Sequence, residues 1–248
     1  MALAFGVDVG GSGIKGALVD LETGELAQER QKIKTPIPAT PKAVAEVIGE
    51  LIRKCEVPEG TPIGVALPAP QRHGTVMFMA NLDQSWVGVN VCDAIEKYTG
   101  YKVRSVNDAD AAGYAEVAYG AAKDNHGVVI VTTLGTGIGS ALVVDGVLVP
   151  NTELGHIEID GHDAEQKAAA SVREKKKLSW DKWAKRLQKY YSTLQMLFTP
   201  DLFVVGGGVS RHHEKFLPKL DLKTPIKPAE LRNTAGIVGA AILAAKDK

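Results

Sequence analysis

Apolar positions along the first half of the chain fall into short runs and into helical spacing. Apolar runs at 3–7 and 17–19 flank a glycine-rich turn, so they predict a β-hairpin, which ends near 28–34. Residues 41–55 place Val, Ile and Leu at helical spacing and predict an amphipathic helix. The apolar run 63–67, which a proline ends, predicts a buried strand.

The same succession of elements returns further along the chain. We expect a helix at 91–98, then a strand at 103–106 that runs directly into an alanine-rich helix up to Tyr119. The second half is expected to contain strands at 128–134, 141–144 and 202–205 and a small-residue helix at 235–245. Because strand, glycine turn, strand and helices occur twice, the pattern predicts two similar α/β halves with a cleft between them.

The two glycine turns are the most informative motifs, and we call them loop 1 (residues 10–13) and loop 2 (residues 135–137). Glycines leave backbone N–H groups open to an anion, and the Ser and Thr hydroxyls add donors. Loop 1 also matches the dinucleotide fingerprint, but that fold requires a helix directly after the turn, whereas a strand is expected at 17–19. A Walker loop is excluded because the chain has no Gly-Lys-Ser/Thr sequence.

Composition narrows the classes of partner. The 248 residues carry 29 basic and 29 acidic side chains, so no overall field attracts nucleic acid or an anionic membrane. No apolar run reaches the roughly 18 residues that a membrane span needs. Cys55 and Cys92 lack motif spacing and are expected to be reduced thiols. These features predict a cytoplasmic protein with neither a nucleic-acid nor a membrane partner.

Longer motifs now suggest a family. Five segments follow the order seen in the ROK family of sugar kinases and repressors: Asp8-x-Gly10-Gly11-Ser12-x-x-Lys15, Asn107-Asp108, Leu134-Gly135-Thr136-Gly137-Ile138-Gly139, Glu153-x-Gly155-His156 and Gly206-Gly207-Gly208-x-Ser210. Within that family the chain resembles the bacterial polyphosphate glucokinases in segments such as Asn81-Leu82-Asp83-Gln84-Ser85-Trp86 and Leu178-Ser179-Trp180. The resemblance covers essentially the whole chain.

This resemblance implies two RNase H-like lobes of the actin, hexokinase and Hsp70 (ASKHA) type around a central cleft, in a homodimer. We expect a smaller N-terminal lobe at 1–107, onto which a helix at 235–248 packs, and a larger lobe at 108–234. Typical members carry a cysteine-rich zinc motif after the His of Glu-x-Gly-His, but no cysteine follows Cys92 here, so no zinc site is expected. Ala69 stands where a glycine is usual.

The resemblance also assigns the sugar acceptor. Asp108 would take the proton of the sugar hydroxyl as general base. Its alternative role is to cap the following helix, and Asp110 is the competing base. Glu153 and His156 would bind neighbouring hydroxyls. The remaining sugar-binding candidates are Asn81, Asp83, Asn107 and Glu165.

On the donor side, Asp8 would hold Mg²⁺ through water, because magnesium keeps several waters in protein sites. The phosphate and nucleotide contacts implied by the resemblance are Gly10, Gly11, Ser12, Gly13 and Lys15 around loop 1, Gly135, Thr136 and Gly137 in loop 2, and Gly206, Gly207 and Gly208 beside an adenosine. Alternatively, these three glycines only form a tight turn after the strand 202–205.

A basic segment at 173–189 holds eight basic and two acidic residues. Polyphosphate is a long polyanion, and its binding requires a basic track. We expect that track to contain Lys123, Arg173, Lys175, Lys176 and Lys177. The alternative is the solvated face of an amphipathic helix.

These expectations together predict a glucokinase of glycolysis and carbohydrate metabolism. It would transfer a phosphoryl group from inorganic polyphosphate, with ATP as a further donor, to the 6-hydroxyl of glucose. The alternative is a strictly ATP-dependent ROK hexokinase for glucose, mannose or a related sugar. A repressor would need a DNA-binding helix-turn-helix before loop 1, and only seven residues precede Asp8. A catalytically dead sugar-binding protein is disfavoured because every expected chemical position is occupied.

Overall fold

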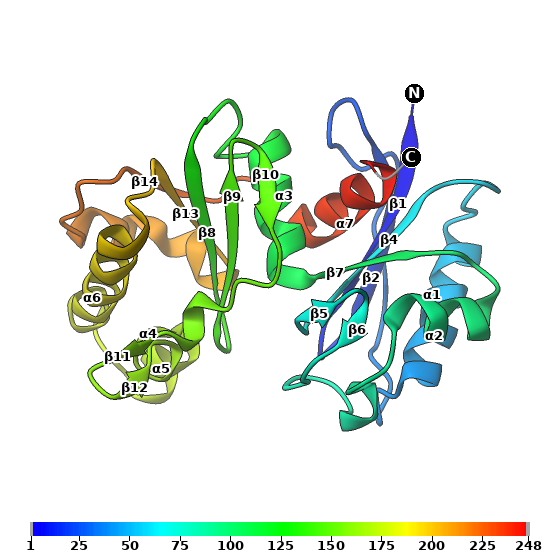
Figure 1. Ribbon diagram of the computed structural model, residues 1–248, viewed down its shortest axis with the longest axis horizontal. Helices are drawn as coiled ribbons and strands as arrows, with labels where there is room; N and C mark the ends of the chain where they lie inside the picture. Colours follow the sequence, from blue (N-terminus) through cyan, green and yellow to red (C-terminus); the bar gives the residue numbers. More distant parts are fainter. Residues whose placement is uncertain (1, 247–248) are drawn as a thin grey trace. The chain divides into compact units, whose positions relative to one another are not determined.

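The computed structural model describes residues 2–246 (Figure 1). They form two compact units, of which unit 1 contains the residues up to Ala115 and from Thr234 onward, and unit 2 contains Glu116–Asn233. The chain passes from one unit to the other inside helix α3 (Asp108–Tyr119), just beyond the boundary expected at residue 107. Of the helix expected at 235–248, the last two residues lie outside the described range.

Unit 1 is built on a five-stranded sheet with the order β3-β2-β1-β4-β7. Its strands are β1 (Leu3–Val9), β2 (Ile14–Asp20), β3 (Gln31–Ile33), β4 (Ile63–Leu67) and β7 (Arg104–Asn107). The first three form an antiparallel meander, and β4 and β7 add to it in parallel. Because parallel strands carry their carboxyl ends at one edge, the end of β7 lies at the same edge as loop 1.

Helices cover both faces of this sheet. Helices α1 (Pro41–Lys54) and α2 (Val91–Thr99) pack on the face where Phe5, Val7 and Val9 are fully buried. Helix α7 (Ala235–Lys246) packs against β1 and β4. The smaller elements of unit 1 are β5 (Gln71–Arg72), β6 (Thr75–Val76) and the 3-10 turn η1 (Gln84–Trp86).

Unit 2 repeats this topology with the order β10-β9-β8-β13-β14. Its strands are β8 (Val128–Leu134), β9 (Ile138–Val144), β10 (Val147–Val149), β13 (Leu202–Gly206) and β14 (Ile226–Pro228). The antiparallel and parallel pairings correspond strand by strand to those of unit 1. The predicted fold class, two RNase H-like α/β units that each open with a glycine hairpin, is confirmed.

The remaining elements of unit 2 gather at the loop 2 end of its sheet. They are η2 (Leu154–His156), the hairpin β11 (Glu158–Ile159) and β12 (His162–Asp163), α4 (Glu165–Ala168) and α5 (Ala170–Lys175). Figure 1 shows α4 and α5 below the strands β8 and β9. The turns η3 (Gly208–Lys215), η4 (Leu217–Lys219) and η5 (Arg232–Thr234) complete the unit.

The basic segment at 173–189 is not one helix. Helix α5 ends at Lys175, and Lys177 has a left-handed φ of 49°. Helix α6 (Trp180–Phe198) then begins anew, because the Ser179 hydroxyl accepts a hydrogen bond from the Lys182 amide at 3.3 Å. Within residues 2–246, no helix has both the length and the apolar content of a membrane-spanning segment.

Candidate active site

Loop 1 is closed at its base by an ion pair. The register of β1 and β2 places Asp8 directly opposite Lys15, and their side chains meet at 2.8 Å between Lys15 Nζ and Asp8 Oδ2. The Gly10 amide donates to the Gly13 carbonyl at 3.1 Å across the turn. Both charged side chains are partly exposed, at 26% for Lys15 and 20% for Asp8, so they are open to a ligand at the loop.

A second lysine covers this loop. Strand β3 places Lys32 opposite Lys15, and a Cβ built on Gly13 would lie only 2.3 Å from Lys32 Cε. The Lys32 side chain therefore lies directly against Gly13. Lys15 is paired with Asp8, so Lys32 adds a further positive charge to loop 1. The sequence analysis missed Lys32, because only the pairing of β2 with β3 brings it to the loop.

At the junction of β7 and α3, Asn107 caps the helix and Asp108 presents a carboxylate. Asn107 is buried, and its Oδ1 accepts hydrogen bonds from the amides of Ala109 at 2.8 Å and Asp110 at 3.2 Å, so Asn107 caps α3. Asp108 Oδ1 also accepts from the Ala109 amide at 2.8 Å, but its carboxylate is only half-buried. Asp110, the competing base, is 1% exposed and cannot reach an external substrate.

The two candidates near residue 80 differ in their surroundings. The backbone carbonyl oxygen of Asn81 is 3.6 Å from a Cβ built on Gly11, so Asn81 lies beside loop 1. Asp83 instead caps η1 by accepting the Ser85 amide at 2.9 Å, and the hydrogen bonding of Ser85 lowers the pKa of Asp83. Asp83 is thus committed to local structure.

In unit 2, two short helices hold loop 2. Ser171, in the first turn of α5, donates through its amide to the Gly135 carbonyl at 3.0 Å and through its hydroxyl to the Thr136 carbonyl at 2.6 Å. From α4, Glu165 Oε2 accepts the Ile138 amide at 3.0 Å. Glu165 therefore lies directly at loop 2, and Ser171 is a positioning residue that the sequence analysis did not include.

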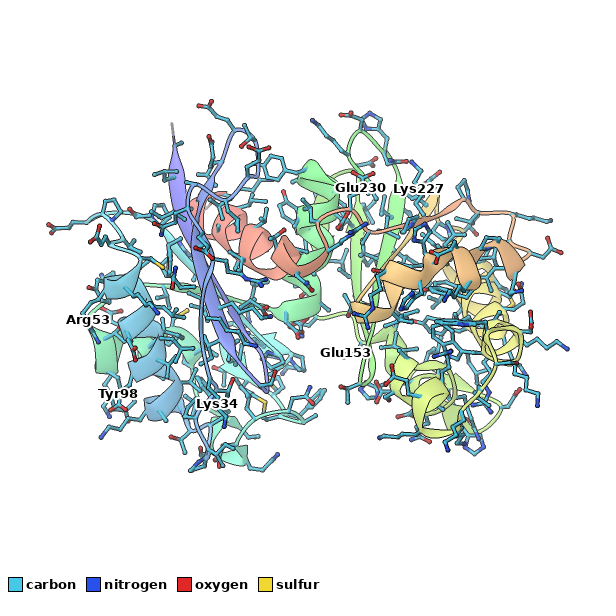
Figure 2. The ribbon with its side chains drawn as sticks, turned by 180° about the vertical axis from the view of Figure 1, so that it is seen from behind. Lys34, Arg53, Tyr98, Glu153, Lys227 and Glu230 are labelled. Carbon is cyan, nitrogen blue, oxygen red and sulfur yellow. The ribbon has the colours of Figure 1, made fainter. Side chains whose placement is uncertain are left out.

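Glu153 immediately precedes the turn η2 and His156 is its last residue, and the turn is attached to β9. The Leu154 amide donates to the buried Ser140 hydroxyl at 2.9 Å. A Cβ at Gly155 would be 2.1 Å from the Ile138 carbonyl oxygen, so only glycine allows this close approach. Figure 2 shows Glu153 near the end of the β8–β9 hairpin that carries loop 2.

The charges of these side chains influence one another. His156 Nδ1 lies 3.1 Å from Asp163 Oδ2, and this hydrogen bond is the main cause that raises the pKa of His156. Burial raises the pKa of Glu153, while the nearby His156 lowers it and Glu165 raises it further. The structure therefore gathers three predicted sugar-binding residues in unit 2, and it adds Asp163, which the sequence analysis missed.

The third glycine run lies beside loop 2. Strand β13 pairs in parallel with β8, with Gly206 opposite Thr133, and Gly207 and Gly208 follow at the edge where loop 2 begins. The two runs thus form one glycine-lined edge within unit 2.

The predicted polyphosphate track is brought together only in part. The Arg173 guanidinium stacks 3.5 Å from the centre of the Trp180 ring, and the exposed Lys175, Lys176 and Lys177 follow at the end of α5. Lys123 precedes β8, whereas Ser171 binds α5 to the opposite end of that strand. A seven-residue strand spans about 20 Å, so Lys123 lies apart from the rest.

No cluster of three or more His, Cys, Asp or Glu side chains that would suit a metal ion occurs among the described residues. Cys55 and Cys92 are free thiols.

Comparison with known proteins adds independent information. The ROK family model matches residues 4–170. The chain is 50% identical over 244 residues to polyphosphate glucokinase of Mycobacterium tuberculosis, covering 98% of this chain and 91% of that protein. It is 26% identical over 317 residues to glucokinase of Streptomyces coelicolor, covering 98% of each chain.

Solved structures agree with this likeness. The inorganic polyphosphate/ATP-glucomannokinase of Arthrobacter sp. strain KM superposes with a TM-score of 0.93 at 50% identity, covering 100% of both chains. A ROK family glucokinase from Streptomyces griseus, solved in complex with glucose and AMPPNP, gives a TM-score of 0.80 at 25% identity, covering 98% of this chain and 99% of that chain.

Proposed function

The chain belongs to the ROK family, and on this premise we propose that it is a glucokinase that uses inorganic polyphosphate, and also ATP, to phosphorylate the 6-hydroxyl of glucose. The likeness to polyphosphate glucokinases along nearly the whole chain supports this donor and this acceptor. The observation that carries the mechanism is Asp108, a half-exposed carboxylate at a strand-to-helix junction where Asn107 caps the helix.

The proposed reaction moves one phosphoryl group and one proton. The glucose 6-oxygen attacks the terminal phosphorus, the bond from that phosphorus to the rest of the donor breaks, and the shortened donor leaves with the electron pair. Asp108 accepts the hydroxyl proton as the new bond forms, which a carboxylate of ordinary acidity does when the transfer is late.

Each unit, taken by itself, contains candidate residues for the acceptor. In unit 2, Glu153, His156 and Glu165 would hold neighbouring hydroxyls, and a protonated His156 would donate to an oxygen of the sugar. In unit 1, Asn107 uses Oδ1 for capping, so its Nδ2 would donate to the sugar. Asn81, beside loop 1, is the further candidate of unit 1.

Each unit also has a glycine loop that is suited to phosphate oxygens of the donor. Backbone amides of loop 1 and loop 2, with the hydroxyls of Ser12 and Thr136, would bind the phosphate oxygens, and Lys15 and Lys32 would neutralise them. Asp8, at the base of loop 1, would hold Mg²⁺, which needs few protein ligands when it keeps its waters. A bound Mg²⁺ would supply charge neutralisation on the donor phosphates.

Beyond the terminal phosphates, a long donor chain would contact Arg173 and Lys175–Lys177. With ATP, the run Gly206–Gly208 beside loop 2 would lie against the adenosine. The second candidate function, a strictly ATP-dependent hexokinase for glucose, mannose or a related sugar, would use this edge alone.

We further propose a homodimer in the cytoplasm, where Cys55 and Cys92 would stay reduced.

One set of assays tests the function. Purified protein is offered glucose or mannose with polyphosphate or ATP and magnesium, and we expect phosphorylation of glucose with both donors. Activity with ATP alone would favour the second candidate, and no sugar phosphate with either donor would reject both.

The variant Asp108→Asn tests the base. Without the proton acceptor, kcat should fall by roughly 10²–10⁴-fold while calorimetry shows unchanged glucose binding. Asp93→Asn, an exposed carboxylate on α2, is the matched control and should keep its activity. Near-normal turnover in Asp108→Asn would remove this residue from the base role.

A further inference from the structure

Unit 2 contains a pocket of about 380 Å³ that the proposed reaction does not use. It lies between α4, the β11–β12 hairpin and α6, and we call it the α4–α6 pocket. The polar residues that line it are Asp160, His162, Lys167, Arg186, Lys189 and Tyr190.

The charge of the α4–α6 pocket is predominantly positive. Lys167, Arg186 and Lys189 face one carboxylate, that of Asp160, with which Lys189 forms an ion pair. Arg186 Nη1 donates to the Lys167 carbonyl at 3.0 Å. This bond fixes the guanidinium plane and uses one of its five N–H donors. A fixed guanidinium flanked by lysines suits an oxyanion such as phosphate.

A buried tyrosine forms part of the wall of this pocket. Tyr190 is 1% exposed, and its hydroxyl has no hydrogen-bond partner among the described residues. A buried hydroxyl without a partner is unfavourable, and native structures nearly always satisfy such a group with protein, water or ligand. Tyr190 lines the pocket but its hydroxyl is shielded from it, so the positive charge of Lys167, Arg186 and Lys189 is what favours an oxyanion here.

We propose that the α4–α6 pocket is a second anion site, which binds the phosphate group of a small phosphate ester or of a short inorganic phosphate chain. The site is distinct from the proposed sugar contacts on α4. Lys167 follows Glu165 by two positions, or about 200° around a helix, so the two side chains project to opposite sides of α4.

Binding of a phosphate in the α4–α6 pocket affects the position of His156 through the β11–β12 hairpin. Asp160 ties the hairpin turn to Lys189, and Asp163, the residue after His162, holds His156 at 3.1 Å. A bound phosphate competes with Asp160 for the Lys189 ammonium and repels that carboxylate, which loosens the hairpin. The KM for glucose then rises while kcat is unchanged. This coupling rests on the proposed sugar-binding role of His156, whereas the anion binding does not.

Hydrogen–deuterium exchange of the full chain tests the binding, with inorganic tripolyphosphate and glucose 6-phosphate as separate probes. We expect protection of residues 164–167 and 186–190, apart from any protection of loop 1 and loop 2, and faster exchange at 158–163, where the hairpin loosens. Protection by glucose 6-phosphate alone supports a phosphate ester as occupant, and protection by tripolyphosphate alone supports a phosphate chain.

Three variants sharpen the test. Lys167→Gln should raise the probe concentration for half-maximal protection about tenfold, as expected for one lost charge-assisted hydrogen bond. Asp160→Asn should lower that concentration, because it removes a repelling charge and releases Lys189. The matched control is Lys227→Gln on β14, an exposed lysine outside the pocket, which should behave as wild type.

Absence of probe-dependent protection in these two segments, or equal protection in wild type and Lys167→Gln, overturns the proposal. Protection that persists in a protein without any sugar kinase activity supports the anion site while rejecting the proposed function. The two inferences are therefore distinguishable.

Discussion

The Asp163 carboxylate orients a histidine that the sequence placed near the sugar. Its hydrogen bond to His156 Nδ1 fixes the orientation of the imidazole ring. The same bond raises the pKa of His156 above the ordinary value of 6.5. A raised pKa in the folded protein contributes stability that is full below pH 6.5 and is lost as the pH rises through the folded pKa.

The variant Asp163→Asn should therefore lower the pKa of His156 toward its ordinary value, because the charged hydrogen-bond partner is lost. An NMR titration of the His156 ring protons measures this shift, and the KM for glucose should rise at neutral pH. Asp93→Asn, an exposed carboxylate on α2 in unit 1, should leave the titration midpoint unchanged. Identical midpoints in wild type and Asp163→Asn would contradict this role.

Among elements, the short turn η2 is closely docked against β9 near the candidate site. Gly155 lies against the backbone of β9, where a Cβ would come within 2.1 Å of the Ile138 carbonyl oxygen. Backbone atoms cannot move aside as a flexible side chain can. The glycine of the Glu-x-Gly-His motif thus serves the docking of η2, while its neighbours supply the polar groups.

Gly155→Ala should displace η2 and lower the free energy of unfolding by about 1–3 kcal/mol, as overpacking in a well-packed region does. Chemical denaturation measures this change, and glucose binding should weaken with it. Gly49→Ala on α1 is the control, since its Cβ meets only side-chain atoms, the nearest at 3.3 Å. Equal stability of wild type and Gly155→Ala would show that η2 adjusts without cost.

For the whole molecule, the balance of charge decides how a polyanion is attracted. The formal net charge is zero, so a long phosphate chain must be held by a local group of basic residues. The exposed Lys175, Lys176 and Lys177 at the end of α5 form such a group. Because α5 begins at loop 2, this group lies on an element that also holds the predicted phosphate contacts.

Replacing Lys175, Lys176 and Lys177 together by alanine should raise the KM for long-chain polyphosphate several-fold and flatten its dependence on salt, while the KM for ATP changes less. Steady-state kinetics at two ionic strengths measure both effects. The matched control replaces three exposed lysines of unit 1, namely Lys54, Lys97 and Lys102, and removes the same charge. An equal rise of the KM for polyphosphate and for ATP would contradict the proposed basic track.

Local pattern was sufficient for most elements and for the repeat. The apolar patterns along 41–55 and 63–67 predicted α1 and β4 nearly to the residue. Burial of one helix face, or of a whole strand, determines which neighbouring positions are apolar. The change from strand to helix at Asn107-Asp108 was likewise predicted from the sequence, since a strand must end where a helix cap begins. Charge and spacing alone did not mark the break at 173–189, where a left-handed Lys177 and the cap at Ser179 divide the basic segment.

By itself, the sequence thus determined the two α/β repeats, the glycine turns and the residues that follow each strand, because these depend on backbone conformation within a few positions. Only the tertiary structure decided which distant side chains meet. Strand pairing brought Lys32 to loop 1, the hairpin brought Asp163 to His156, and the length of β8 set Lys123 apart from α5. Such contacts depend on register and packing between segments far apart in the chain, which no local pattern encodes.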